Sequence, residues 1–250
     1  MPPVPDPPGK TNRNRTLVIA IAVAVAIAAA LVVGSYLTGD DGDDAAPAET
    51  TSIETSAPTV DPAITLVAGV PQKGTVLGNP EATVRLLQFE DLQCPFCKDY
   101  TLNTLPAIID EYVRPGLVKI DFRGIAFLGA DSEKALRIAV AAGFQDKLWE
   151  VTGLFYENQG DENTGWVTDS LIDEILAEVP GLDAAKVKVD AKGAAVTKEI
   201  EAVQAEATTL QVGGTPWFYI GIGVSAPYEI RPTALEPSAF RPALDDAIKG

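Results

Sequence analysis

Residues 84–97 read Val-Arg-Leu-Leu-Gln-Phe-Glu-Asp-Leu-Gln-Cys-Pro-Phe-Cys, and the predicted architecture can be built outward from them. Residues 84–89 form a short apolar run between turn residues and an acidic pair, which predicts a buried strand. A helix is expected over residues 99–113, because Arg114-Pro115-Gly116 would end it. Residues 118–122 then alternate with a period of two, which indicates a second strand. This order predicts a βαβ unit with a right-handed crossover.

The rest of the chain is predicted to be helical before two late strands. Helices are expected over residues 132–144, 146–156, 168–179 and 194–210, with a short one capped by Asp183 before the last. Strand patterns return at residues 217–220 and 228–231, and residues 237–249 are typical of a terminal amphipathic helix. The order βαβ, helices, β, β, α predicts one α/β domain.

Cys94 and Cys97 place two sulfur atoms one helical turn apart, so a disulfide between them could open and close with little backbone movement. At a helix N-terminus, unpaired N–H groups and the helix dipole would favour the Cys94 thiolate. Pro95 suits the first helical position, which needs no N–H. Three other interpretations stay open: a static disulfide, a metal-ligand pair and two buried free thiols. A static bridge over so short a loop would constrain the unfolded chain little, so redox activity is favoured.

The amino-acid composition excludes several kinds of catalytic and metal-binding site. The 250 residues carry 19 Lys and Arg against 35 Asp and Glu, a net charge of −16, with two cysteines and no histidine. Without histidine, no Ser-His-Asp triad, Cys-His dyad or His-ligated metal site can form, and two cysteines cannot hold an iron–sulfur cluster. The acidic balance argues against nucleic acid as a partner, because binding phosphate needs clustered Lys and Arg. We therefore expect neither a metal nor a cofactor.

The N-terminal quarter of the chain predicts a membrane anchor. Residues 17–37 are almost entirely apolar, and 21 residues of helix span about 31 Å, enough to cross a bilayer core. Basic residues precede this run and aspartates follow it, so residues 1–16 are expected in the cytoplasm and the main domain outside. A cleaved signal peptide is the alternative, although the run is longer than usual for one. Residues 38–63, rich in Asp, Ala, Thr, Ser and Pro, are expected to form a disordered, flexible acidic linker.

Two motifs together resemble those of a known family. Phe89-Glu-Asp-Leu-Gln-Cys-Pro-Phe-Cys97 and Gly213-Gly-Thr-Pro-Trp217 resemble the motifs of the DsbA-like branch of the thioredoxin superfamily, and in particular its membrane-anchored proteins from Gram-positive bacteria. The resemblance implies a thioredoxin-like fold over residues 64–250, with a helical insertion at about residues 129–210. It implies a thiol:disulfide oxidoreductase.

The resemblance also implies roles for individual residues. Cys94 would be the exposed nucleophile that forms a mixed disulfide, and Cys97 the buried resolving cysteine. Pro216 would be cis and would place the backbone of Thr215 beside the Cys94 sulfur, where an extended substrate segment could pair with it. Pro95 and Phe96, between the cysteines, would support the site.

Two departures from the family bear on oxidising strength. Phe96 stands where many DsbA proteins have His, and Gln88 stands where the family carries a buried acid. Glu90 and Asp91 are nearby, but the sequence assigns neither to that role. With the acidic balance of the chain, these features predict a less acidic Cys94 and a weaker oxidant than a DsbA with His between its cysteines.

The predicted function is oxidation of exported protein thiols by a membrane-tethered monomer with one membrane pass. A membrane quinone reductase of the DsbB or VKOR type would be its reoxidant. Two alternatives remain: the same site working as a disulfide reductase or isomerase, and a non-enzymatic binding or chaperone module whose Cys94–Cys97 bridge is static.

Overall fold

The computed structural model describes residues 61–250. The expected cytoplasmic tail at residues 1–16, the membrane span at residues 17–37 and all but the last few residues of the expected linker lie outside the described residues. Within residues 61–250, none of the helices combines the length and the apolar character that crossing a bilayer requires.

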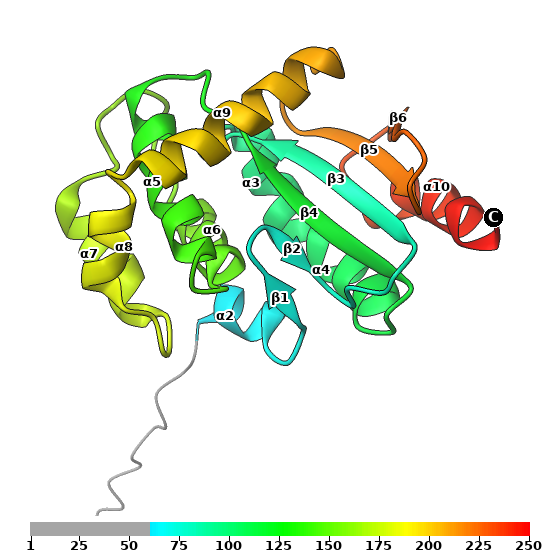
Figure 1. Cartoon of the computed structure of the whole chain (residues 1–250), viewed down its shortest axis with the longest axis horizontal. Helices are drawn as coiled ribbons and strands as arrows, with labels where there is room; N and C mark the ends of the chain where they lie inside the picture. The colour runs from blue at the N-terminus through cyan, green and yellow to red at the C-terminus, as the bar shows by residue number, and fades with distance from the viewer. Residues whose placement is uncertain (1–60) are drawn as a thin grey trace, which may run out of the picture. The chain divides into compact units, whose positions relative to one another are not determined.

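The centre of the molecule is a six-stranded sheet (Figure 1). Its order is β1 (Gln72–Lys73), β2 (Val76–Leu77), β4 (Val118–Gly124), β3 (Val84–Glu90), β5 (Trp217–Ile222) and β6 (Tyr228–Ile230). Strands β3 and β4 are parallel over seven residue pairs, from Val84–Val118 to Glu90–Gly124, and every other pairing is antiparallel. The parallel pair confirms the predicted strand–helix–strand unit.

The segment between β3 and β4 is helical from Pro95 to Val113. It consists of α3 (Pro95–Asp99), a π-helical stretch η1 (Tyr100–Thr104), α4 (Leu105–Ile108) and a second π-helical stretch η2 (Ile109–Val113). The expected start at Asp99 is therefore wrong by four residues, because the helix already begins within the cysteine motif. The segment ends where predicted, before the Arg114-Pro115-Gly116 turn.

The predicted helical block follows β4. It contains α5 (Ala130–Gly143), α6 (Leu148–Glu157), α7 (Asp169–Glu178), α8 (Ala184–Asp190) and α9 (Ala194–Thr209). Two of its caps follow from the sequence: the Thr168 hydroxyl accepts from the Leu171 N–H, and the Asp183 carboxylate accepts from the Lys186 N–H. The terminal helix α10 (Pro237–Lys249) has its predicted bounds.

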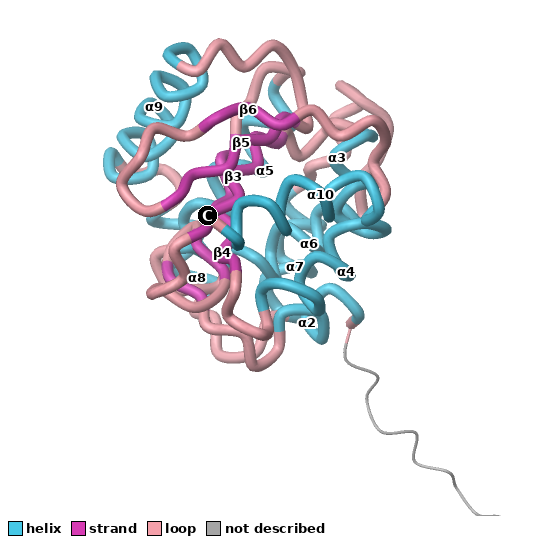
Figure 2. The backbone as a smooth tube through the Cα atoms, turned by 90° about the vertical axis from the view of Figure 1, so that its right-hand side faces the viewer, coloured by secondary structure: helices cyan, strands magenta, loops and turns pink. Residues whose placement is uncertain are grey.

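Helices cover the sheet on both sides. Figure 2 shows α2 (Pro62–Val67), α4, α6 and α10 on one side of the strands and α9 on the other. The side chains of β3 alternate between these sides: Leu86 joins the main core, whereas Leu87 and Phe89 join a second cluster that includes Val203 of α9. Gln88 and Glu90, two and four residues after Leu86, therefore point toward the α4 and α6 side.

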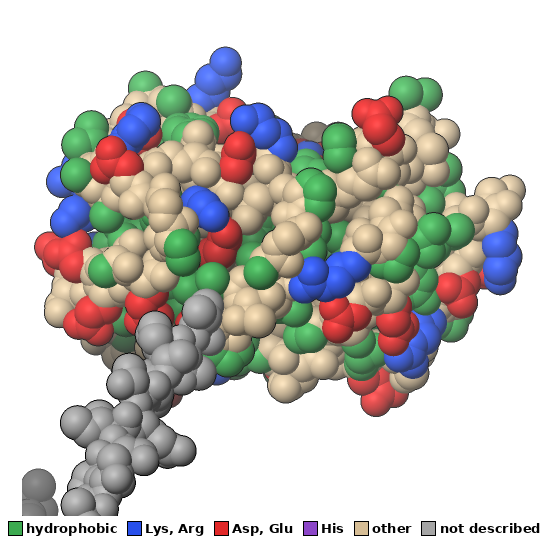
Figure 3. Space-filling model, turned by 90° about the horizontal axis from the view of Figure 1, so that it is seen from below, with side chains coloured by type: hydrophobic (Ala, Val, Ile, Leu, Met, Phe, Trp, Pro, Cys, Tyr) green, Lys and Arg blue, Asp and Glu red, His purple; other side chains and the backbone are tan. Residues whose placement is uncertain are grey.

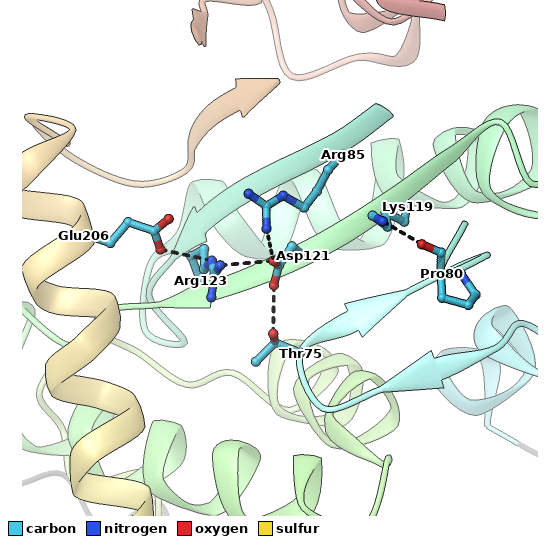
Figure 4. A network of polar contacts seen from close by, with 7 residues as sticks. All are labelled: Thr75, Pro80, Arg85, Lys119, Asp121, Arg123 and Glu206. Carbon is cyan, nitrogen blue, oxygen red and sulfur yellow. Dashed lines mark hydrogen bonds and ion pairs between the residues drawn. The ribbon is translucent and has the colours of Figure 1, made fainter. Parts of the chain in front are cut away.

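The α9 side of the sheet carries a charged network (Figure 4). The buried carboxylate of Asp121 accepts from the Thr75 hydroxyl at 2.7 Å and pairs with Arg85 at 3.4 Å and Arg123 at 3.1 Å. Arg123 also pairs with Glu206 of α9 at 3.2 Å. Two arginines thus compensate one buried acid, and the pairs tie β3, β4 and α9 together.

The surface carries charges of both signs, although the chain is acidic overall. The face seen in Figure 3 carries acidic and basic side chains interspersed with apolar ones, without a broad area of one sign. Long-range attraction for a polyanion would need such a basic area.

Three short elements have no counterpart among the predicted ones: α2, β1 and β2. Helix α2 begins at Pro62, two residues before the expected domain start at residue 64, and Ala63 within it is buried. The β1–β2 turn is held from far along the chain, because the Asp146 carboxylate accepts from the Gly74 N–H at 3.0 Å. Elements of two to six residues have little periodicity of their own and depend on such distant contacts.

Candidate active site

Cys94 lies where β3 gives way to α3. Its backbone is extended (φ −71°, ψ 120°) and caps the helix, while Pro95 occupies the first turn as predicted. The Lys98 N–H donates to the Cys94 carbonyl at 3.1 Å, and the Cys94 N–H donates to the Asp91 carbonyl at 2.9 Å. Hydrogen bonds on both sides of Cys94 therefore fix its sulfur over the first turn of α3.

The two free thiols have opposite acidities. The pKa of Cys94 is lowered to about 6, most of all by a hydrogen bond from the Cys97 side chain. Thr215 and the N–H groups of Cys97 and Phe96 also lower it, while burial acts in the opposite direction. Burial raises the pKa of Cys97 well above its ordinary value, and the charges of Glu90 and Cys94 add to this. At neutral pH the pair therefore holds a thiolate on Cys94 and a thiol on Cys97.

The loop before β5 covers Cys94. The Thr215–Pro216 peptide bond is cis, as the family resemblance implied. In its protonated form Cys94 donates to the Thr215 carbonyl at 3.4 Å, and the buried Thr215 hydroxyl has no oxygen or nitrogen partner within residues 61–250. Cys94 is only 5% exposed, so the expectation of an exposed nucleophile is wrong.

Asp91 organises the turn that precedes Cys94. One carboxylate oxygen accepts from the Phe127 and Leu128 N–H groups at 3.0 and 3.1 Å. The other accepts from the Gln93 N–H at 2.8 Å and the Ser132 hydroxyl at 2.5 Å. The side chain is fully buried, so these four donors satisfy a carboxylate that has no access to water. Asp91 therefore has a positioning role, and its carboxylate is already saturated.

The helical insertion also holds this turn. Gln159, just after α6, donates to the carbonyls of Leu92 and Cys94 at 2.9 and 3.2 Å. The Gln93 side chain accepts from the Asn163 N–H at 2.8 Å. None of these contacts follows from the cysteine motif, because the partners lie 65 to 70 residues downstream.

Glu90 is the second of the two buried acids just before Cys94 to which the sequence assigns no role. It accepts from the Tyr156 hydroxyl at 2.7 Å and from the Thr101 hydroxyl at 3.1 Å. The pKa of Glu90 is raised to about 8, chiefly by burial; the two hydrogen bonds act in the opposite direction, and the charge on Cys94 makes a small raising contribution. The charge of Glu90 in turn raises the pKa of Cys97. Glu90 and the cysteine pair therefore titrate under each other's influence.

Gln88 occupies the position where the family carries its acid. Its side-chain oxygen accepts from the Tyr100 hydroxyl at 2.9 Å, and it is buried on the same side of β3 as Glu90. Residues two apart on a strand share a face. An acid at position 90 therefore lies on the same side of the sheet as one at position 88 would, which is the side that holds Cys97. The alternation of side chains along β3 is the sequence signal that could have identified Glu90.

Phe96, between the cysteines, is 64% exposed, so it presents an apolar surface at the start of α3. Phe127, which follows β4 and bonds to Asp91, is also exposed. Between residues 61 and 250, no three Cys, Asp or Glu side chains gather closely enough to hold a metal ion. The site brings together the two sulfur atoms and the buried carboxyl group of Glu90.

Comparison with known proteins agrees with this geometry. The model of a thioredoxin family (described as "Thioredoxin") matches residues 71–231, more than half of the chain. The chain belongs to the thioredoxin family.

Relatives and solved structures place the chain among the DsbA-like members of that family. "Probable disulfide bond formation protein D" of Bacillus cereus is 29% identical over 154 residues, covering 60% of this chain and 71% of the relative. Oxidised BdbD from Bacillus subtilis has a TM-score of 0.61 at 21% identity, covering 72% of this chain and 98% of that chain. A thioredoxin-like oxidoreductase from Silicibacter pomeroyi has a TM-score of 0.55 at 28% identity, covering 76% and 95%. The chain is a DsbA-like thiol:disulfide oxidoreductase.

Proposed function

We propose that this thioredoxin-family chain oxidises the thiols of exported proteins through Cys94 and Cys97. The observation that carries the proposal is the asymmetric thiol pair, which has an acidic Cys94 beside the cis-proline loop and a buried Cys97 behind it. A thiol of lowered pKa is both a good attacking group and a good leaving group in disulfide exchange. The printed name of the Bacillus cereus relative, a disulfide bond formation protein, supports this direction.

The reaction starts from the Cys94–Cys97 disulfide. A substrate thiolate attacks the Cys94 sulfur, a mixed disulfide forms, and Cys97 leaves as a thiolate that takes up a proton. A second substrate thiolate then attacks the substrate sulfur of the mixed disulfide and releases Cys94 as a thiolate. The substrate has lost two electrons to form its disulfide, and the protein has gained them as a dithiol. Thr215 and Pro216 would align the substrate segment beside Cys94.

Glu90 is proposed as the proton partner of Cys97, in place of an acid at Gln88. A group that exchanges protons efficiently near neutral pH needs a pKa close to that pH. Burial gives Glu90 a pKa of about 8, and its charge is felt at Cys97. A carboxylic acid at this position can protonate the leaving Cys97 thiolate and can accept the proton back in the reverse reaction.

We further propose a moderate oxidising strength. The pKa of about 6 at Cys94 lies nearer to that of thioredoxin, roughly 7, than to that of DsbA, roughly 3.5. At pH 7 a thiolate of pKa 6 stabilises the reduced form by about 1.4 kcal/mol, and one of pKa 3.5 by about 4.8 kcal/mol. The difference of about 3.4 kcal/mol corresponds to about 70 mV. We expect a reduction potential lower than that of DsbA by this amount.

The proposed setting is the outer side of the cell membrane, with a single-pass anchor at residues 17–37. The oxidised state must be restored by a partner that removes two electrons, and a membrane quinone reductase of the DsbB or VKOR type fits this requirement. The chain is proposed to act as a monomer on its protein substrates.

The deciding experiment traps the mixed disulfide. A Cys97→Ala variant of the full chain, expressed with its export signal, lacks the resolving thiol and should accumulate mixed disulfides with exported proteins through Cys94. A Cys94→Ala variant is the matched control, and it should trap nothing. A non-enzymatic module with a static bridge would trap nothing in either variant, and that result would overturn the proposal.

The redox equilibrium with glutathione distinguishes an oxidase from a reductase. A potential close to that of thioredoxin, roughly −270 mV, would favour a reductase over the proposed oxidase. A value between roughly −230 and −150 mV would agree with the moderate oxidant expected from the acidity of Cys94.

A further inference from the structure

A cavity of about 320 Å³ is lined by Glu90 and by residues of α2, α4 and α6. These three helices lie on one side of the strands in Figure 2. Most of its wall is apolar and includes Leu66, Leu102 and Trp149. Pro62 and Thr65 also line it and are exposed, so the cavity reaches the surface beside α2. One water molecule takes up roughly 30 Å³ of liquid, so the cavity has room for several.

Glu90 forms part of the inner wall. One of its oxygens is occupied by the hydroxyls of Tyr156 and Thr101, whereas Oε1 is buried and has no hydrogen-bond partner anywhere in residues 61–250. A buried carboxyl oxygen without a partner is costly, and most such atoms in folded proteins are hydrogen-bonded to protein or water. The unpaired oxygen of Glu90 belongs to a side chain that lines an open cavity, where a water molecule can hydrogen-bond to it.

A second acid, Glu157, lines the same cavity nearer the surface. It follows Tyr156 at the end of α6 and is half-buried. Burial and the neighbouring carboxyl of Asp61 raise the pKa of Glu157 to about 7, Glu178 adds to this, and the Ala63 N–H acts in the opposite direction. The cavity therefore has one acid at its inner wall and another at its rim, and both exchange protons within the range where the enzyme would work.

We propose that this cavity is the route by which protons reach and leave Glu90, with Glu157 as the group that exchanges them with solvent. The proposal rests on the proposed exchange at Cys94 and Cys97. When the substrate thiolate attacks Cys94, the disulfide breaks and the leaving Cys97 thiolate takes a proton from Glu90. The Glu90 carboxylate regains a proton through water in the cavity, and Glu157 restores that proton from bulk solvent. Each transfer reverses when the dithiol is oxidised.

Glu157 acts through Glu90 and never meets the substrate, so it is a positioning residue. Its loss should slow proton exchange without changing the end states of the reaction. We therefore expect rates to change while the equilibrium potential stays constant. A residue that only supported the fold would not show this combination.

The main test is the single-turnover reduction of the oxidised full chain by dithiothreitol, followed by stopped-flow fluorescence across neutral pH. Glu157→Gln should reduce the rate on the order of five-fold near pH 7, a modest share of what one acid–base group contributes. Added imidazole, a small buffer that can enter the cavity, should restore most of this rate. The potential against glutathione should equal that of the unmodified protein.

A second variant closes the route without touching a charge. Leu102→Phe enlarges a wall side chain and should slow reduction as Glu157→Gln does, but imidazole should not rescue it. Glu178→Gln is the matched control, because it removes a nearby acid that does not line the cavity, and its rate should stay within about two-fold of the unmodified protein.

The outcomes separate this proposal from the one on which it rests. Unchanged rates in both Glu157→Gln and Leu102→Phe would overturn the proton route while leaving thiol–disulfide exchange intact. A slow Glu157→Gln that imidazole does not rescue, or whose potential moves, would also overturn it in favour of a structural role. Failure of the unmodified protein to exchange with thiols at all would instead refute the proposed function.

Discussion

Replacing Glu90 by glutamine should stabilise the folded protein relative to the unmodified chain, and this gain in stability should grow as the pH rises. The folded chain raises the pKa of Glu90 to about 8 from an ordinary 4.5, chiefly through burial. Between these values the folded chain binds more protons than the unfolded chain, so stability falls with increasing pH and the loss is complete above about pH 8. Glutamine does not titrate, and its oxygen can accept from Tyr156 and Thr101 as the carboxyl does.

The magnitude follows from the size of the shift. Each pKa unit is worth about 1.4 kcal/mol. The 3.5 units between 4.5 and 8 therefore correspond to about 5 kcal/mol at alkaline pH, and the 2.5 units between 4.5 and 7 to about 3 kcal/mol at pH 7. Below about pH 4 the carboxyl is protonated in both states, so Glu90→Gln should differ little from the unmodified protein there.

Urea unfolding of the disulfide form at several pH values measures this difference, because neither cysteine titrates in that form. The thiolate of Cys94 is the smallest contribution to the shift of Glu90, so its absence changes the expectation little. Glu81→Gln, which alters an exposed acid, is the control and should give a flat difference. A Glu90→Gln difference that stays constant between pH 4 and pH 9 would refute the burial argument.

Three further changes test other parts of the structure. Phe96→His places a cation beside the Cys94 thiolate, so it should lower the thiol pKa measured by alkylation rate and raise the potential by about 30 mV; an unchanged pKa would contradict this. Asp91→Asn removes the charge and one acceptor from four buried donors, and urea unfolding should show a loss of about 2–4 kcal/mol, whereas a neutral result would mean that the turn is held elsewhere. Gly153→Ala should lower stability by about 1–2 kcal/mol, because a Cβ there would lie 2.7 Å from the Ala63 Cβ; Ala63→Gly in the same chain should recover part of the loss, and a Gly153→Ala protein as stable as the original would disprove the clash.

Much of the fold follows from periodicity in the sequence. The alternation in β4 and the apolar run of β3 predicted the parallel pair, and helix-face spacing, with Asp183 as one cap, predicted helices of the insertion to within a few residues. Such patterns are local consequences of which face is buried. Helix α2 and the β1–β2 hairpin could not be predicted this way, because Asp146 and Gly153, which support them, lie more than 70 residues downstream.

The cysteine and proline motifs can be read from contiguous sequence, whereas the hydrogen-bond partners that surround Glu90 cannot. Cys94, Cys97 and the Thr215–Pro216 pair belong to short contiguous motifs, so their meeting follows from the family resemblance. The burial of Glu90 depends on Tyr156, which is 66 residues away and occupies a helix whose packing no local pattern specifies. The π-helical stretches η1 and η2 are likewise outside what helix-face spacing can distinguish.

The carboxyl of Glu90 is held from two sides, by Thr101 of the segment after the cysteines and by Tyr156 of the insertion. Residues 130–209 are therefore not a detachable module that merely shapes the substrate surface. A chimera that exchanged this block with that of another family member would also exchange Tyr156, which donates to Glu90, and so would inherit part of that member's pH response along with its surface. Grafting substrate specificity onto this scaffold would accordingly require residue 90 and its two hydroxyl donors to be exchanged together.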